Sequence, residues 1–308
     1  MRHFFVSIAT FALLMTSSIV ISGGIDIKTK NAFTKVWEKC DKCKQPESAY
    51  YDRDSGIVFV SNVGGDPTKK DGDGTISILK TVTGKPISNP TWVTGLNAPK
   101  GLRSAKGKLY VSDIDTLVVI DIKTGKIEKK ISVAGAKFLN DVAIDNAGNI
   151  YISDTMANKV FKVTNDKVTT FASGDELESP NGLLVLGEKL IVASWGKGMK
   201  PDWSTSTLGG LYSLELKTAK KTPIAMNIGH LDGLEVDNNG DYLVSDWMAG
   251  KVIKVTKAGK PHVLLYGFKG SADIGYIPQN KELIVPRMGE NLITGYNLGK
   301  YPNYNNMK

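Results

Sequence analysis

Six short phrases recur along the chain, and four of them carry an oxygen-bearing side chain at one shared position. In chain order, this position holds Glu47, Lys100, Asn140, Asn181, Asp232 and Ala272. Carboxylate and amide oxygens are the ligands that calcium prefers, with water or substrate completing its roughly six to eight positions. If the fold brings the phrases together, Glu47, Asn140, Asn181 and Asp232 are therefore the expected ligands of a calcium ion, with another divalent cation as the alternative.

Other metals fit these residues less well. Zinc prefers His and Cys ligands, and only His230 and His262 remain once the first 24 residues are set aside. Magnesium demands tight octahedral geometry, whereas ligands on separate strands around a wide channel give a flexible site.

The phrases lie 40 to 53 residues apart, which suits a repeat of four strands and their turns. Helical periodicity of useful length is absent. The sequence therefore predicts an all-β fold, a six-bladed β-propeller, as a single domain over residues 25–308. In such a fold the shared position of every repeat faces one axis, so residues remote in sequence form one ring.

The third and fifth repeats show the expected strands most clearly, because apolar and polar residues alternate between turn-forming stretches. The sixth repeat runs out of sequence before its outer strand. Residues 32–38, with Phe33, Val36 and Trp37, are predicted to pair there and cover the open edge. The expected strands of the third and fifth repeats are 142–145, 150–153, 159–163 and 168–171, and 234–237, 242–245, 251–255 and 263–265.

The strand order places the shared position and the loops after each second strand at the same end of the propeller. Two of these loops, residues 61–74 and 194–209, are long enough to form walls of a pocket. The run Asp71-Gly72-Asp73-Gly74 lacks the third acidic position and the distal Glu of a calcium-binding helix-loop-helix motif. We interpret it as a loop.

The phrases around Glu47, Asn181-Gly182 and Asp232-Gly233 resemble those of the senescence marker protein, gluconolactonase and luciferin-regenerating enzyme family, over nearly all of the chain beyond residue 24. The resemblance implies a six-bladed propeller that holds a divalent ion, usually calcium, through a Glu, an Asn and an Asp. It also implies that Asp232 is the catalytic base or nucleophile. The pair Asn140-Asp141 looks like a motif that this family and its relatives, the paraoxonases and diisopropyl fluorophosphatase, place beside the ion.

Other residues near the shared position are candidates for binding a small-molecule substrate. Lys100 departs from the ligand pattern and faces the channel by register, where it either contacts an anionic group or has no chemical task. The full set of predicted substrate-binding residues is Lys100, Asp141, Trp195, Trp247 and Asp273.

Two classes of function remain open. The first is a calcium-dependent hydrolase of lactones or related esters, and the second is a non-catalytic propeller that binds a sugar or a protein partner. Trp195, Trp203 and Trp247 fit either class. A Ser/His triad is not expected, because no nucleophile-elbow sequence accompanies His230, which is read as a supporting residue.

The N-terminus predicts export. Residues 1–24 combine Arg2, an apolar stretch and small residues in the layout of a secretory signal, with a retained membrane anchor as the alternative. We expect a periplasmic or secreted protein without stable membrane insertion. The formal charge of +8 comes from scattered lysines without the clustered arginines and aromatics of a nucleic-acid surface, so no nucleic-acid partner is expected.

Both cysteines lie in one motif, Cys40-Asp41-Lys42-Cys43. The motif lacks the His of a haem attachment site, further zinc ligands and a thioredoxin-like context. A local disulfide is the preferred interpretation in an oxidising compartment.

Overall fold

The computed structural model describes residues 33–39, 42–82 and 85–299. The proposed signal segment and Cys40 lie outside these residues. Cys43 is disulfide-bonded. Within the described part of the chain, no helix has the length and apolar character needed to cross a membrane.

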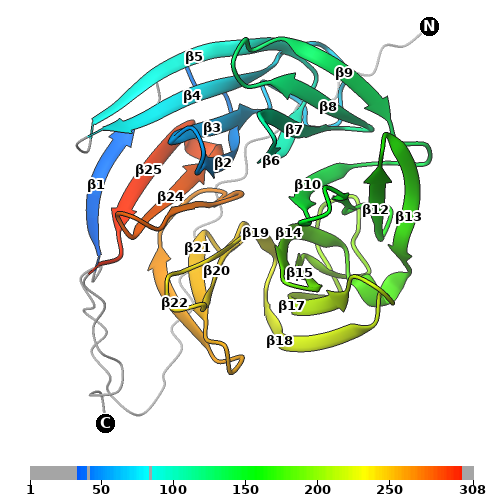
Figure 1. Cartoon of the computed structure of the whole chain (residues 1–308). Coiled ribbons are helices and arrows are strands. Elements are labelled where there is room, and N and C mark those ends of the chain that lie inside the picture. The colour runs from blue at the N-terminus through cyan, green and yellow to red at the C-terminus, as the bar shows by residue number, and fades with distance from the viewer. Residues whose placement is uncertain (1–32, 40–41, 83–84, 300–308) are drawn as a thin grey trace, which may run out of the picture. The chain divides into compact units, whose positions relative to one another are not determined.

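The prediction of an all-β, six-bladed propeller is confirmed. Six antiparallel sheets surround a central axis, each with one strand at the axis and one at the rim (Figure 1). The described helices are two single 3-10 turns, η1 (Asp175–Leu177) and η2 (Met288–Glu290).

The strands at the axis contact one another in turn, which closes the ring. These inner strands are β2 (Pro46–Asp52), β6 (Pro99–Ala105), β10 (Leu139–Ile144), β14 (Pro180–Leu186), β19 (Leu231–Val236) and β23 (Gly275–Ile277). The second strands are β3 (Ile57–Asn62), β7 (Lys108–Asp113), β11 (Ile150–Asp154), β15 (Lys189–Ser194), β20 (Tyr242–Asp246) and β24 (Glu282–Arg287).

The outer half of each blade completes the sheet. The third strands are β4 (Gly74–Val82), β8 (Thr116–Asp121), β12 (Lys159–Thr164), β17 (Thr207–Glu215), β21 (Lys251–Val255) and β25 (Leu292–Asn297). The rim strands are β5 (Lys85–Leu96), β9 (Ile127–Ser132), β13 (Lys167–Ser173), β18 (Lys221–Gly229), β22 (Pro261–Tyr266) and β1 (Thr34–Lys39). A short strand, β16 (Gly196–Lys197), extends the fourth blade.

The N-terminal strand β1 closes the ring. It pairs with β25 and supplies the outer strand of the sixth blade, where the sequence placed residues 32–38. Trp37 packs on Gly295 and donates a hydrogen bond from Nε1 to Glu282 Oε1 at 2.5 Å. Between the sixth and first blades, Asp273 N–H donates to Glu47 C=O and Ala49 N–H to Asp273 C=O. β1 therefore covers the edge of β25, which would otherwise be open to pairing with another chain.

The hydrophobic core is divided among the contacts between blades. Each of six buried clusters joins side chains of two neighbouring blades; the cluster of the third and fourth blades, for example, packs Tyr151 and Val160 against Leu183, Val192 and Tyr212. One face of a sheet supplies half of each cluster, which accounts for the period-2 pattern in the sequence. The rigid support of the axis therefore comes from packing between blades.

Candidate functional site

Five of the six shared positions lie in a β-bulge at the start of an inner strand. In the first five blades the pairing with the second strand shifts across the residue in question, for example between Leu139 and Val142 around Asn140. A bulge leaves a residue out of the ladder and can redirect its side chain. The bulges therefore turn Glu47, Lys100, Asn140, Asn181 and Asp232 toward the channel, and all five line one cavity.

The residue after the shared position is glycine in three blades, for a steric reason. A Cβ at Gly101 would lie 2.5 Å from Asp141 Cα, one at Gly182 would lie 2.1 Å from Asp232 C=O, and one at Gly233 would lie 2.3 Å from Ile274 N. The first two contacts are to the inner strand of the next blade, and the third is to the residue that precedes β23. The glycines therefore allow neighbouring inner strands to approach closely enough for the shared positions to surround one channel.

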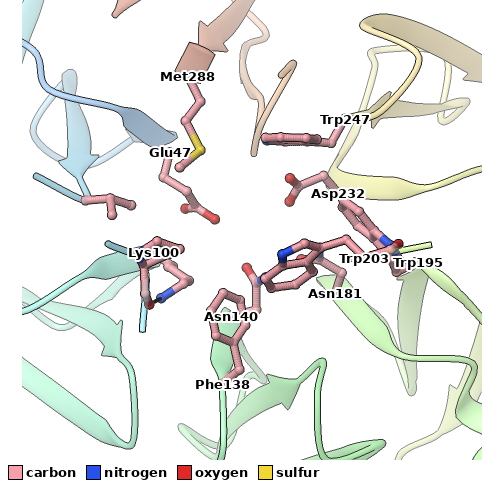
Figure 2. A pocket seen from close by; sticks show the side chains of 12 residues that line it. Glu47, Lys100, Phe138, Asn140, Asn181, Trp195, Trp203, Asp232, Trp247 and Met288 are labelled. Carbon is pink, nitrogen blue, oxygen red and sulfur yellow. Dashed lines mark hydrogen bonds between the residues drawn. The ribbon is translucent and has the colours of Figure 1, made fainter. Parts of the chain in front are cut away.

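The four predicted ligands lie together at the base of the cavity. Figure 2 shows the carboxylates of Glu47 and Asp232 and the amides of Asn140 and Asn181 directed toward the same space. All four side chains are buried. Within the described residues, Glu47 Oε2, Asn181 Oδ1 and Asp232 Oδ1 have no hydrogen-bond partner. Burial of unpaired polar atoms is unfavourable. We therefore expect these oxygens to bind a group that comes from outside the protein.

Electrostatics lead to the same conclusion. Burial, and then the charges of Asp232 and Asp273, raise the pKa of Glu47 well above its usual range. Burial, followed by the charges of Asp273 and Asp141, likewise raises the pKa of Asp232. A cation among these oxygens would reverse both shifts, because an opposite charge favours the ionised carboxylate.

The donor set fits a hard divalent cation. It comprises two carboxylates and two amides, the ligand types that calcium takes, and leaves positions for water or substrate. No group of three or more His, Cys, Asp or Glu side chains suited to a metal occurs in the described part of the chain. That finding is consistent with this site, because half of its donors are asparagines.

The Lys100 ammonium lies against backbone carbonyl groups and an aromatic ring of the protein. It donates hydrogen bonds to Pro67 C=O at 3.1 Å and Ala98 C=O at 3.0 Å, and lies 4.2 Å from the centroid of the Phe138 ring. Burial lowers the pKa of Lys100 to about 8, although Glu47, Asp113 and Asp154 oppose the shift. Lys100 thus fastens the long loop between β3 and β4 to the ring.

Aromatic side chains form one wall of the cavity, from the third to the fifth blade (Figure 2). Ring centroids are 5.2 Å apart for Phe138 and Trp203, 5.9 Å for Trp203 and Trp195, and 6.0 Å for Trp195 and Trp247. We call these four residues the aromatic wall. His230 lies behind it, with its ring 5.5 Å from Trp195 and its Nε2 3.0 Å from Thr205 Oγ1.

Trp203 holds its place in the wall at a conformational cost. Its φ of 65° lies in the left-handed region, which a bulky residue rarely adopts. Its N–H donates to Lys200 C=O, and its C=O accepts from Trp195 Nε1 at 2.9 Å. Strain of this kind costs on the order of 1–3 kcal/mol and is concentrated at functional sites.

Asp141 and Asp273 were predicted from the sequence to bind substrate, but they do not line the cavity. Asp141 accepts hydrogen bonds from Val142 N–H and, in the next blade, Leu183 N–H. Asp273 accepts from Ser48 Oγ in the first blade at 2.5 Å. Burial raises the pKa of both carboxyls, and the nearby positive charge of Arg103 opposes the shift. These residues connect blades below the ring.

A serine at the end of several second strands supports the ring, a role that was not predicted from the sequence. Ser153 Oγ donates to Asn181 C=O at 2.6 Å, Ser112 Oγ to Asn140 C=O, and Ser245 Oγ to Ala272 C=O at 2.8 Å. In each case a blade holds the shared position of the next. The recurring Ser-Asp pair at these strand ends was the available signal.

The aspartate of the pair fixes the segment that leads into the inner strand. Asp113 accepts from Ala98 N–H, and Asp154 accepts from Lys137 and Phe138 N–H. These bonds set the position of Phe138 in the aromatic wall.

Comparisons with known proteins identify the fold. No protein-family profile and no curated protein matches the sequence. A gluconolactonase structure from Xanthomonas campestris is similar at a TM-score of 0.63, with 13% identity over 86% of this chain and 89% of that one. A catalytically inactive histidine-to-alanine variant of virginiamycin B lyase from Staphylococcus aureus, solved with quinupristin, gives a TM-score of 0.57, with 12% identity over 86% and 99% of the chains.

A third similar structure comes from a nidogen/laminin complex, with a TM-score of 0.57 and 13% identity over 70% of this chain and 87% of that one. The sequence resemblance to gluconolactonase-like propellers is therefore confirmed for the fold. At these identities the propeller is shared by proteins of different function, so the function of this chain has to be argued from its own site.

Proposed function

We propose that this protein is an exported, calcium-dependent hydrolase that opens lactones or related esters. The observation that carries the proposal is the convergence of buried, unpartnered oxygens of Glu47, Asn181 and Asp232, with Asn140 beside them, at the base of a cavity. Glu47, Asn140, Asn181 and Asp232 would hold the ion. When bound, calcium would supply a positive charge that polarises a carbonyl group and offsets the negative charge that develops as water attacks.

Asp232 is the residue of this site best suited to move a proton. Its carboxylate lines the cavity beside the other three proposed ligands. Asp232 would accept a proton from the attacking water and return it to the ring oxygen when the bond between the carbonyl carbon and the ring oxygen breaks, which gives a hydroxy acid. The aromatic wall would hold the substrate ring and exclude bulk water from one side.

Hydrolysis is favoured over the elimination chemistry that a lyase performs. The similar lyase structure is inactive after a histidine-to-alanine change. The residues that line the cavity of this chain include no histidine, and His230 lies behind Trp195. The carboxylate pair is the proton-transfer group that the cavity offers instead.

A lactone panel with and without calcium tests the proposal. We expect hydrolysis in calcium, loss of hydrolysis in EDTA and recovery when calcium is restored. Glu47→Gln should abolish the calcium-dependent rate, whereas Glu188→Gln, at an exposed turn, should retain it. Calcium binding without hydrolysis of any lactone or ester would contradict the enzymatic proposal and favour a binding module.

A further inference from the structure

The cavity above the ring is apolar on both sides. The aromatic wall, Phe138, Trp195, Trp203 and Trp247, forms one side. Val63, Pro67 and Met288 line the other. Apart from the four oxygen-bearing residues at the base, the polar groups of the lining are the ammonium of Lys100 and the indole N–H groups of the three tryptophans.

Few hydrogen-bonding groups of this lining are left for a ligand. Two donors of the Lys100 ammonium bind Pro67 C=O and Ala98 C=O, so one of its three remains. Trp195 Nε1 binds Trp203 C=O, which leaves the N–H groups of Trp203 and Trp247 as the remaining indole donors of the lining. A ligand with several hydroxyl groups would thus enter a space that offers partners to few of them.

The volume of the cavity matches one ring. It measures about 160 Å³, similar to an apolar cavity of roughly 150 Å³ that binds benzene. The base supplies oxygen ligands for a cation, and the walls supply apolar contact.

Resting on the proposed function, we infer that the substrate is a compact, single-ring lactone with hydrocarbon substituents, and not a polyhydroxylated sugar lactone. Such a ring packs against the aromatic wall while its ester faces the base. A sugar lactone of the same ring size would bury hydroxyl groups without partners, and each such group lowers affinity by about tenfold or more. Two unpartnered hydroxyls correspond to a preference of at least about 100-fold.

A matched pair of substrates tests the inference. δ-Valerolactone and D-glucono-δ-lactone share the six-membered ester ring and differ in the hydroxyl and hydroxymethyl groups. After subtraction of uncatalysed hydrolysis, we expect kcat/KM for δ-valerolactone to be at least about 100-fold higher. Equal or preferred turnover of D-glucono-δ-lactone would overturn the inference and leave the proposed hydrolase intact.

Binding gives a readout that does not depend on turnover. The corresponding lactams resist hydrolysis, and tryptophan fluorescence in calcium reports their binding because three of the five tryptophans line the cavity. We expect δ-valerolactam to bind at least about tenfold more tightly than D-glucono-δ-lactam. Stronger binding of the sugar lactam, or no binding of either, would refute the inference even if no lactone is hydrolysed.

Substitution of Trp203 links the preference to the aromatic wall. Asn tolerates the left-handed conformation, so Trp203→Asn removes the ring without adding backbone strain. We expect kcat/KM for δ-valerolactone to fall by at least about tenfold while calcium-dependent thermal stabilisation is retained. Trp92→Phe, in the first blade and against Phe59, is the control for loss of a tryptophan and should change neither quantity. An unchanged kcat/KM for δ-valerolactone in Trp203→Asn would contradict the assignment.

Discussion

Asp232→Asn tests whether the buried oxygens form a cation site. The substitution keeps the shape of the side chain and removes one of the two charges in the proposed ligand set. In the absence of a cation, Asp232 is one of the charges that raise the pKa of Glu47. The variant should therefore be more stable than the natural protein in EDTA and should gain less from calcium.

The size of the calcium effect follows from mass action. At a calcium concentration about 100 times Kd, binding to the folded state alone contributes about 2.7 kcal/mol. For a large domain, 1 kcal/mol shifts Tm by roughly 2–4 °C, so the natural protein should gain about 5–10 °C. Removing a group that merely supports a metal ligand weakens binding about 10- to 100-fold, and loss of a charged ligand should be at least as severe. With a 100-fold loss, the same calcium concentration contributes about 0.4 kcal/mol, or roughly 1–2 °C.

Thermal unfolding followed by circular dichroism, in EDTA and across a calcium titration, measures both effects. Asp71→Asn is the matched control, because Asp71 lies in an exposed loop and should respond to calcium like the natural protein. The reasoning is refuted if Asp232→Asn keeps the full calcium shift, or if it melts below the natural protein in EDTA. A loss of the calcium shift in Asp71→Asn would instead place the ion in the loop.

Three further predictions concern the groups around the ring. The folded-state pKa values of Glu47, Asp232 and Asp273 are raised above their unfolded values, so their contribution to stability is present at low pH and lost as pH rises through the raised values. In EDTA, Tm should thus increase as the pH is lowered from 7 to about 5, whereas saturating calcium should abolish or reverse this trend. Identical dependences of Tm on pH with and without calcium would contradict the coupling between these carboxyl groups and the ion. Lys100→Met should tighten calcium binding several-fold, as measured by calorimetry, because it removes a nearby positive charge. In the natural protein, calcium affinity should increase as the pH rises through the Lys100 pKa of about 8. Unchanged calcium affinity in both experiments would contradict an electrostatic effect of Lys100 on the ion. Ser153→Ala should weaken calcium binding by about tenfold because Asn181 loses its support, whereas Ser194→Ala, which loses hydrogen bonds to Gly210, should lower stability by about 1–2 kcal/mol without changing calcium affinity. Equal losses of calcium affinity in the two serine variants would exclude a specific positioning role.

The sequence by itself determined the repeat and the chemical types at its shared position. Spacing and alternation are local properties, because a strand places side chains on opposite faces wherever it occurs. They were sufficient to predict six four-stranded blades, and oxygen ligands at four of the six shared positions. The N-terminal segment could also be assigned to the last blade, because that blade lacked a strand and the segment offered Trp37.

Only the tertiary structure decided which of two adjacent polar residues enters the cavity. Asn140 and Asp141 are neighbours, yet Asn140 lines the cavity while Asp141 binds backbone N–H groups of its own and the next blade. The difference depends on a bulge and on contact with another blade, and neither is encoded in the local alternation. The support from Ser153 to Asn181 and the packing of Trp203 on Phe138 likewise join different blades. Local pattern fixes which groups are available, but the direction of a side chain depends on the neighbours that folding brings to it.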